Sequence, residues 1–412
     1  MILKNMKIKT LILAAALAAP SLAGAQSLFP EWQARIMDNN PSLRAQEAVA
    51  DAQMADNQAG LNLGNPEVSL SYMFGRPSGV PNRTNIEVTQ PFDFATLSGA
   101  KRRVADADDK VAYATCMASI GDLALEIENA LIEYVYQSTL VQELTLQNDD
   151  IQRMLQVAHK SLEQGKITQL EYNKLELEGL STGNALALAQ PDLEAARQEL
   201  VRLNGGEPLE GLPTAWPDVT VPDSFEDWVN GAALVSPELM ALSADLKRAE
   251  EEVNLRKKEG LPDFSVGYTC ELVQGANYYG AALGFSLPLW GNHGRVKAAK
   301  AQYAAAQIQL ETATDQFRIR KQNEYRRLMV LQSTCQQYEK AYCQVRQQGE
   351  EYLDKAVKAG TIGMLEYMTE REDYFEHALA RLTILRDFHQ ARALLYAPTL
   401  TAPLLFRRPT RP

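Results

Sequence analysis

One stretch occurs twice in this chain of 412 residues, and it constrains the fold more than any other feature. The first copy, Gly165 to Tyr172, reads Gly-Lys-Ile-Thr-Gln-Leu-Glu-Tyr, and the second, Gly360 to Tyr367, reads Gly-Thr-Ile-Gly-Met-Leu-Glu-Tyr. Each copy lies within a long region of helix-forming residues. A Gly there costs about 1 kcal/mol relative to Ala, which indicates a helix C-terminus. Both stretches are therefore predicted to be turns between two helices.

The two copies are 195 residues apart, and other matches keep nearly the same interval along the chain. Asn40-Pro41-Ser42-Leu43 corresponds to Ser236-Pro237-Glu238-Leu239, and Gln137-Ser138-Thr139 corresponds to Gln332-Ser333-Thr334. A period this long is not that of a solenoid repeat. We therefore expect two copies of one half: a first repeat over residues 26–203 and a second over 236–397. Residues 204–235, rich in Pro and Gly, are expected to link the halves.

The N-terminus has the pattern of a secretory signal peptide. Three lysines precede an apolar run from Thr10 to Ala19, and Ala23-Gly24-Ala25 forms a small-x-small cleavage site. We assign residues 1–25 to the signal peptide and expect the mature chain to begin at Gln26. The apolar run is too short to span a membrane.

Charge and composition argue against several function classes. The net charge of −11 argues against nucleic-acid binding. The four cysteines are scattered and the four histidines lack the spacing of a metal site, so we expect no cofactor and no metal. No nucleophile elbow, phosphate-binding loop or dinucleotide fingerprint is present, and the chain is not predicted to be an enzyme.

Each half is predicted to contain a helix, a β-hairpin and a pair of long helices, in that order. Apolar and polar residues alternate in 67–92 and again in 263–288, around turn-rich centres. The helices that follow, with tips near 165 and 360, are much longer than ordinary globular helices and resemble a coiled coil. Pro191 is expected to break or kink the helix that returns from the first tip. The proline-rich residues 398–412 are expected to be a disordered tail.

Four strands with one apolar face allow two architectures. Outward apolar residues with aromatic residues at the strand ends fit a membrane β-barrel. Such barrels have about eight strands or more, so one chain cannot close one, whereas three chains would supply twelve strands. The alternative is a small soluble sheet packed on helices. In the barrel arrangement, the long Ala-rich helices would form a tube with the glycine turns at its far end.

This ordered set of features resembles the TolC family of outer-membrane efflux proteins from about Asn40 to Leu395. The resemblance rests on the duplicated order, the two proline helix starts, the two tips and the strand-to-helix junctions. These junctions are Gln90-Pro91-Phe92 followed by Ser98-Gly99-Ala100-Lys101-Arg102, and Leu287-Pro288-Leu289-Trp290 followed by Gly294-Arg295. The resemblance implies a mainly α fold with membrane β: helical hairpins forming a periplasmic α-barrel, and four strands per chain in a trimeric, twelve-stranded β-barrel.

The resemblance also implies a function, partners and a location. The chain would be a homotrimeric exit duct of a tripartite efflux system in the outer membrane of a Gram-negative bacterium, with a large periplasmic portion. It would work with a periplasmic adaptor, or membrane fusion, protein and with an inner-membrane transporter of the resistance-nodulation-division class. The junction at Lys101-Arg102 resembles the heavy-metal efflux branch. The alternatives are the outer channel of a type I protein secretion system and a periplasmic coiled-coil adaptor or scaffold.

Candidate site residues follow from the resemblance at the tips. A periplasmic gate is expected at Glu366, Thr369 and Glu370. Three copies of Glu366 around a narrow axis would repel each other and attract cations. The alternative is that Glu366 is a solvated residue on the helix surface. Contacts with the adaptor are expected at Gly165, Ile167, Leu170, Glu171, Gly360, Ile362 and Leu365.

Overall fold

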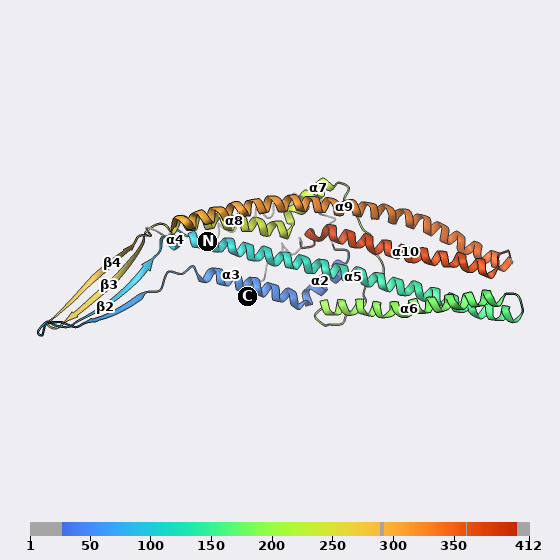
Figure 1. The fold of residues 1–412 in the computed structure, drawn as a ribbon, viewed down its shortest axis with the longest axis horizontal. Helices are drawn as coiled ribbons and strands as arrows, with labels where there is room; N and C mark the ends of the chain where they lie inside the picture. Colours follow the sequence, from blue (N-terminus) through green and yellow to red (C-terminus); the bar gives the residue numbers. More distant parts are fainter. Residues whose placement is uncertain (1–26, 289–291, 360, 402–412) are drawn as a thin grey trace. The chain divides into compact units, whose positions relative to one another are not determined.

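The structure is a computed structural model that describes residues 27–288, 292–359 and 361–401 (Figure 1). Its elements, in chain order, are α2 (Pro30–Asn39), α3 (Pro41–Ala59), β1 (Glu67–Met73), β2 (Arg83–Phe92), α4 (Phe94–Leu97), α5 (Ala100–Glu163), α6 (Gln169–Leu203), α7 (Phe225–Val235), α8 (Pro237–Lys258), β3 (Asp263–Val273), β4 (Ala276–Ser286), α9 (Asn292–Ala359), α10 (Met364–Tyr396) and the 3-10 helix η2 (Ala397–Thr399). The order of helix, hairpin, long helix and return helix therefore occurs twice, as the repeat predicted.

The chain forms two compact units that do not coincide with the two repeats. One unit, here named the tip unit, comprises Met1–Arg44, Ile120–Val235 and Phe317–Pro412. The other, here named the sheet unit, comprises Ala45–Ser119 and Ser236–Gln316. Each unit thus takes segments from both repeats, and the boundaries fall within α5 and α9.

The sheet unit contains one four-stranded antiparallel sheet with the strand order β1-β2-β3-β4. The register places Val88 of β2 opposite Val68 of β1 and opposite Tyr268 of β3, and Val266 of β3 opposite Leu283 of β4. Because successive side chains of a strand point to opposite faces, this register gathers the apolar residues on one face. The opposite face carries small and polar residues: Ser69, Ser71, Asn85, Glu87, Thr89, Ser265, Gly267, Thr269, Gly280 and Gly284.

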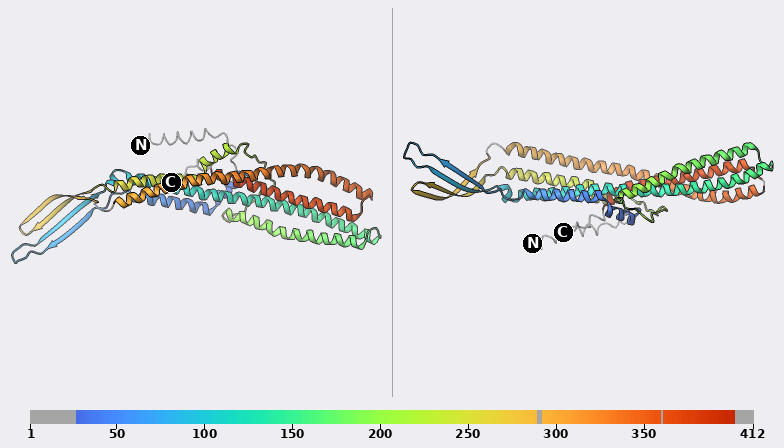
Figure 2. Two further views of the ribbon diagram at one scale, coloured as in Figure 1. Left: turned by 45° about the horizontal axis from the view of Figure 1, so that its top comes forward. Right: turned by 90° about the horizontal axis from the view of Figure 1, so that it is seen from below.

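The apolar face of the sheet is uncovered in the single chain. Val68 and Leu70 are each 71 % exposed, and Phe285 is 76 % exposed. Figures 1 and 2 show no helix of the sheet unit packed along the strands. The alternative of a small sheet packed on helices is therefore wrong for this chain.

The long helices α5 and α9 each precede one of the two tips. α5 has 64 residues and α9 has 68, so each is roughly 100 Å long at about 1.5 Å per residue. Gly349 of α9 lies where α10 approaches closely, because a Cβ at this position would be 1.9 Å from the Tyr374 hydroxyl oxygen. The predicted break at Pro191 is wrong, since α6 continues through it. Pro191 and Ala187 are both exposed, so water can reach the carbonyl of Ala187 that the proline leaves without a donor.

Two terminal predictions fall partly or wholly outside the described residues. The signal peptide, residues 1–25, lies outside them, as do residues 402–412 of the expected disordered tail. For residues 398–401 the expectation of disorder is wrong, because Thr399, Leu400 and Thr401 are buried and η2 packs against α7. Among the described helices, none combines the length and the hydropathy required of a transmembrane helix.

Candidate functional site

The first tip ends α5 with a glycine in the left-handed conformation. Gly165 has a φ of +65°, which an L-residue with a Cβ rarely adopts. The amide of Lys166 donates to the carbonyl of Ser161 at 2.8 Å, and the amide of Gly165 donates to that of Leu162 at 2.9 Å. These two bonds form a Schellman motif, which explains why the sequence places a glycine there.

The helix after the first tip begins with a capping box. The Thr168 hydroxyl accepts from the Glu171 amide at 3.2 Å, and the Thr168 amide donates to a Glu171 carboxylate oxygen at 2.7 Å. The hydrogen bonds from the Thr168 amide and hydroxyl lower the pKa of Glu171. Glu171, expected at an adaptor contact, therefore has a local role in starting α6.

The second tip repeats the turn but not the cap. The amide of Thr361 donates to the carbonyl of Ala356 at 3.0 Å, at positions equivalent to Lys166 and Ser161. The N-cap of α10 is Gly363, which has no side chain and so cannot form a capping box with Glu366. Glu366 is exposed, and its carboxylate is not used in starting the helix.

The remaining predicted tip residues differ in their surroundings. Leu170 is 78 % exposed, and Ile362 is partly exposed, so both can meet another surface. Ile167 packs against a buried cluster of Ile151, Ala158, Leu175 and Met368, and it therefore helps to hold the tip together. Gly360 and the side chain of Leu365 lie outside the described residues.

The two helical hairpins of the tip unit touch at equivalent positions of the repeat. The Lys174 ammonium of α6 donates to the Thr369 hydroxyl of α10 at 3.4 Å, and these residues are 195 apart in the chain. Thr369 was expected at the gate, and here its hydroxyl contacts α6. Glu370 next to it is exposed.

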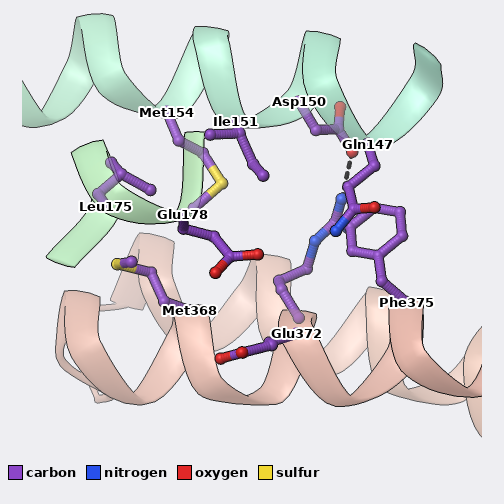
Figure 3. Close-up of a pocket in the computed structure, with 10 residues that line it drawn as sticks. Gln147, Asp150, Ile151, Met154, Leu175, Glu178, Met368, Glu372 and Phe375 are labelled. Atoms are coloured by element: carbon purple, nitrogen blue, oxygen red, sulfur yellow. Dashed lines mark hydrogen bonds and ion pairs between the residues drawn. The ribbon is translucent and has the colours of Figure 1, made fainter. Parts of the chain in front are cut away.

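An ion pair joins the same hairpins two residues further along α10. Asp150 of α5 pairs with Arg371 of α10, whose side chain is 17 % exposed (Figure 3). The guanidinium also lies over the Phe375 ring, 5.3 Å from its centroid. The exposed Arg153 contacts the other oxygen of the same carboxylate. Asp150 therefore links α5 to α10 while also bonding within its own helix.

A water-sized cavity of about 20 Å³ lies beside this ion pair. Its walls include Gln147 and Glu178, together with Glu372 of α10 (Figure 3). Burial, and secondarily the charge of Glu372, raises the pKa of Glu178. The Arg371 Nε atom is buried and has no partner among the described residues. The cluster is thus a polar junction that a single water molecule can complete.

Sequence reasoning did not find this junction. Asp150 and Arg371 are 221 residues apart, and neither belongs to a local motif. The repeat interval could have pointed to one contact, because Lys174 and Thr369 occupy equivalent positions.

Comparisons with known proteins show which family and which relatives this chain resembles. Residues 32–206 match the family model described as outer membrane efflux protein. This part of the chain is therefore similar to members of that family. A curated relative, the cobalt-zinc-cadmium resistance protein CzcC of Cupriavidus metallidurans, is 24 % identical over 230 residues. That match covers 55 % of this chain and about half, 54 %, of the relative's length.

Two solved structures of outer-membrane proteins share the fold over nearly the whole chain. The outer-membrane channel OprN superposes with a TM-score of 0.71 at 16 % identity, covering 90 % of each chain. The outer membrane protein VceC of Vibrio cholerae gives a TM-score of 0.67 at 17 % identity, covering 91 % of this chain and 95 % of that one. The predicted fold class, mainly helical with four antiparallel strands per chain, is confirmed. The family is one of channel proteins.

Proposed function

We propose that this chain is a member of the outer membrane efflux protein family, that it is the outer-membrane exit channel of a tripartite efflux system, and that it works as a homotrimer. The observation that carries the proposal is the uncovered apolar face of the four-stranded sheet. A soluble monomer rarely exposes an apolar surface that extends over four strands. A lipid bilayer is the environment in which such a face is stable.

The edges of the sheet support an assembly of several chains. β1 and β4 are the edge strands, so each presents backbone groups without a partner in the single chain. Such groups must be paired within a bilayer, which requires a closed barrel. Pairing β4 of one copy with β1 of the next in three copies closes a barrel of about twelve strands, an even number as in other such barrels.

The long helices carry apolar stripes that also need partners. On α9, Ile319, Val330 and Tyr352 are exposed at intervals of 11 or 22 residues. On α5, Leu146 and Val157 are exposed at the same interval of 11 residues. Eleven residues are three turns of about 3.67 residues, which keeps a stripe on one side and favours a right-handed supercoil. Neighbouring copies in a trimer would bury these stripes and form a tube.

The tips supply the proposed gate and docking surface. Glu366 is exposed and free of a capping role, so three copies could line a narrow end and select cations there. Thr369 contacts Lys174, and Glu370 is the other exposed carboxylate on that turn. Leu170 and Ile362 offer apolar surface to a periplasmic adaptor, which in turn would engage an inner-membrane transporter of the resistance-nodulation-division class.

The similarity to CzcC supports placing the chain in the heavy-metal efflux branch. In this proposal the chain conducts passively, and its partners supply the energy and select the substrate. A coiled-coil adaptor or scaffold would contain one helical hairpin, whereas this chain has two, at α5–α6 and α9–α10. The type I secretion alternative has no observation in its favour.

Site-directed labelling of β1 tests the proposal. In a background with the four cysteines replaced by alanine, single cysteines at Val68, Leu70, Ser69 and Ser71 would carry an environment-sensitive fluorophore. In reconstituted protein, labels at Val68 and Leu70 should be quenched by nitroxide lipids, and those at Ser69 and Ser71 by an aqueous quencher. Four labels that all respond to the aqueous quencher alone would overturn the proposal.

A further inference from the structure

We propose that the basic residues where strands meet helices form a docking surface for anionic phospholipid headgroups. This inference rests on the proposed membrane insertion of the sheet, and it assigns a role to the Lys101-Arg102 motif that a channel function alone leaves unexplained. The surface consists of Arg102, Lys257, Arg295, Lys297 and Lys300, all exposed residues of the sheet unit.

The sheet register brings these residues to one end of the sheet. Phe92, Phe264 and Phe285 lie opposite one another, so β2 ends, β3 begins and β4 ends at the same place. α5 follows β2 after a short connection containing α4, α8 immediately precedes β3, and α9 follows β4. The ends of α5, α8 and α9 that carry the basic residues therefore adjoin this end of the sheet.

The charges at α5 and α9 contradict the usual preference of helix ends. A helix N-terminus carries a partial positive charge, so a cation there costs about 0.3–1 kcal/mol. Nevertheless, Arg102 lies in the first turn of α5, Arg295 and Lys297 lie near the start of α9, and neither helix has an acidic residue in its first turn. Lys257, in the last turn of α8, is placed favourably. Two helices that break the same local rule indicate a requirement from outside the chain.

Nearby carboxylates are already paired with other cations. Asp93 pairs with Lys101 at 3.2 Å, and Glu251 pairs with Arg103 at 3.2 Å. Glu252 and Glu259 both pair with Arg256, each at 2.7 Å. In the part of the chain that the structure describes, the five surface cations have no ion pair.

Aromatic residues mark the same end of the sheet. The Phe92 and Phe264 rings stack at 5.3 Å between centroids, and the Lys258 ammonium lies over the Phe94 ring, 5.5 Å from its centroid. Aromatic rings beside Lys and Arg are typical of a membrane–water interface. The net charge of −11 would otherwise repel an anionic surface, so a local basic cluster is what allows close approach.

Lipid binding to the detergent-solubilised full-length chain tests this surface. The test variant combines Arg102→Gln, Arg295→Gln and Lys297→Gln. The control combines Lys160→Gln, Lys166→Gln and Arg197→Gln, which removes three exposed cations of the tip unit. Native mass spectrometry would count bound phosphatidylglycerol and phosphatidylcholine across a lipid titration, at low and high salt.

The wild type and the control should prefer phosphatidylglycerol, and the test variant should bind it about 10- to 100-fold more weakly. Raising the salt should reduce the preference of the wild type. Three results would each refute the proposed docking surface. They are wild-type binding of phosphatidylglycerol by the test variant, an equal loss of binding in the control, and displacement of the lipid by inorganic phosphate at matched concentration. Size analysis of the same samples reports separately on the proposed trimer, which can stand without this surface.

Discussion

Removing the carboxylate of Asp150 should loosen the junction between α5 and α10. The Asp150→Asn change leaves the Arg371 guanidinium without its anion while keeping the size of the side chain. The side chains of Arg371 and Asp150 are 17 % and 31 % exposed, so this ion pair is intermediate between an exposed and a buried one. Surface pairs contribute about 0–1 kcal/mol, and breaking a buried pair costs about 3–5 kcal/mol. We therefore expect a local loss of about 1–3 kcal/mol.

Hydrogen exchange measures this loss directly. A loss of about 1–3 kcal/mol corresponds to amide exchange about 5- to 150-fold faster in residues 147–154 and 368–375. Amides of α7 should exchange at the rate of the wild type. The matched control is Arg153→Met, because Arg153 contacts the same carboxylate from an exposed position with a side chain that is 74 % exposed.

Two outcomes would refute the reasoning. Unchanged exchange in Asp150→Asn would mean that the ion pair does not hold the hairpins together. Equal acceleration in Arg153→Met would mean that the helical i,i+3 contact matters as much as the bond to α10. A double-mutant cycle of Asp150→Asn with Arg371→Met isolates the coupling between the two side chains.

Three further changes have defined outcomes. Burial, and secondarily the charge of Arg392, lowers the pKa of His389 from 6.5 to about 4. As the pH falls, the unfolded chain therefore binds this proton before the folded chain does. The free energy of unfolding should decrease between about pH 6.5 and pH 4. His389→Phe keeps a ring that can stack on Trp216. At pH 5 this variant should avoid a loss of about 2 kcal/mol in the free energy of unfolding, measured with denaturant. An unchanged pH dependence would exclude His389 as its source. Gly363→Thr should create a capping box with Glu366 and slow exchange at the start of α10 by a factor equivalent to about 0.5–1 kcal/mol, whereas faster exchange would argue against the extended backbone at this position. Glu366→Gln should lower the cation selectivity of the channel in planar bilayers, because it removes the three carboxylates that attract cations at the narrow end, and unchanged selectivity would remove Glu366 from the gate.

The sequence predicted those parts of the fold that depend on local signals. Glycines at 165 and 360 marked both tips, and the same backbone hydrogen bond closes the turns at Lys166 and Thr361. Alternating apolar residues located the four strands to within a few residues, because one face of each strand must remain apolar. The 195-residue interval then fixed the order of elements in the second half.

Features that depend on tertiary surroundings were not predictable in this way. Pro191 was expected to break or kink α6, but its exposed position allows solvent to compensate for the lost hydrogen bond, so the helix continues. Residues 398–401 were predicted to belong to a disordered tail because the segment is rich in proline. In the structure Leu400 is buried, and the Thr399 hydroxyl donates to the Tyr396 carbonyl at 2.7 Å. Such packing has no counterpart in local periodicity.

In the candidate site, too, features set by local sequence could be predicted, and features set by the packing of the hairpins could not. Glu171 and Glu366 were found from the repeated motif, but the motif alone did not reveal that only Glu171 forms a capping box. That difference arises from Thr168 and Gly363 at equivalent positions, and it could have been read from the sequence. The pairing of Asp150 with Arg371 could not, because it depends on how two hairpins pack.

The most direct test of the central claim is the size of the protein extracted from membranes, before and after heating. Cell fractions would be separated into outer membrane and periplasm, and the detergent-solubilised protein would be sized by gel filtration with light scattering. A heat-sensitive trimer in the outer-membrane fraction is the result that the uncovered sheet and its open edges predict. A monomer in the periplasmic fraction would contradict the account, because the apolar face of β1 to β4 would then have to be stable in water.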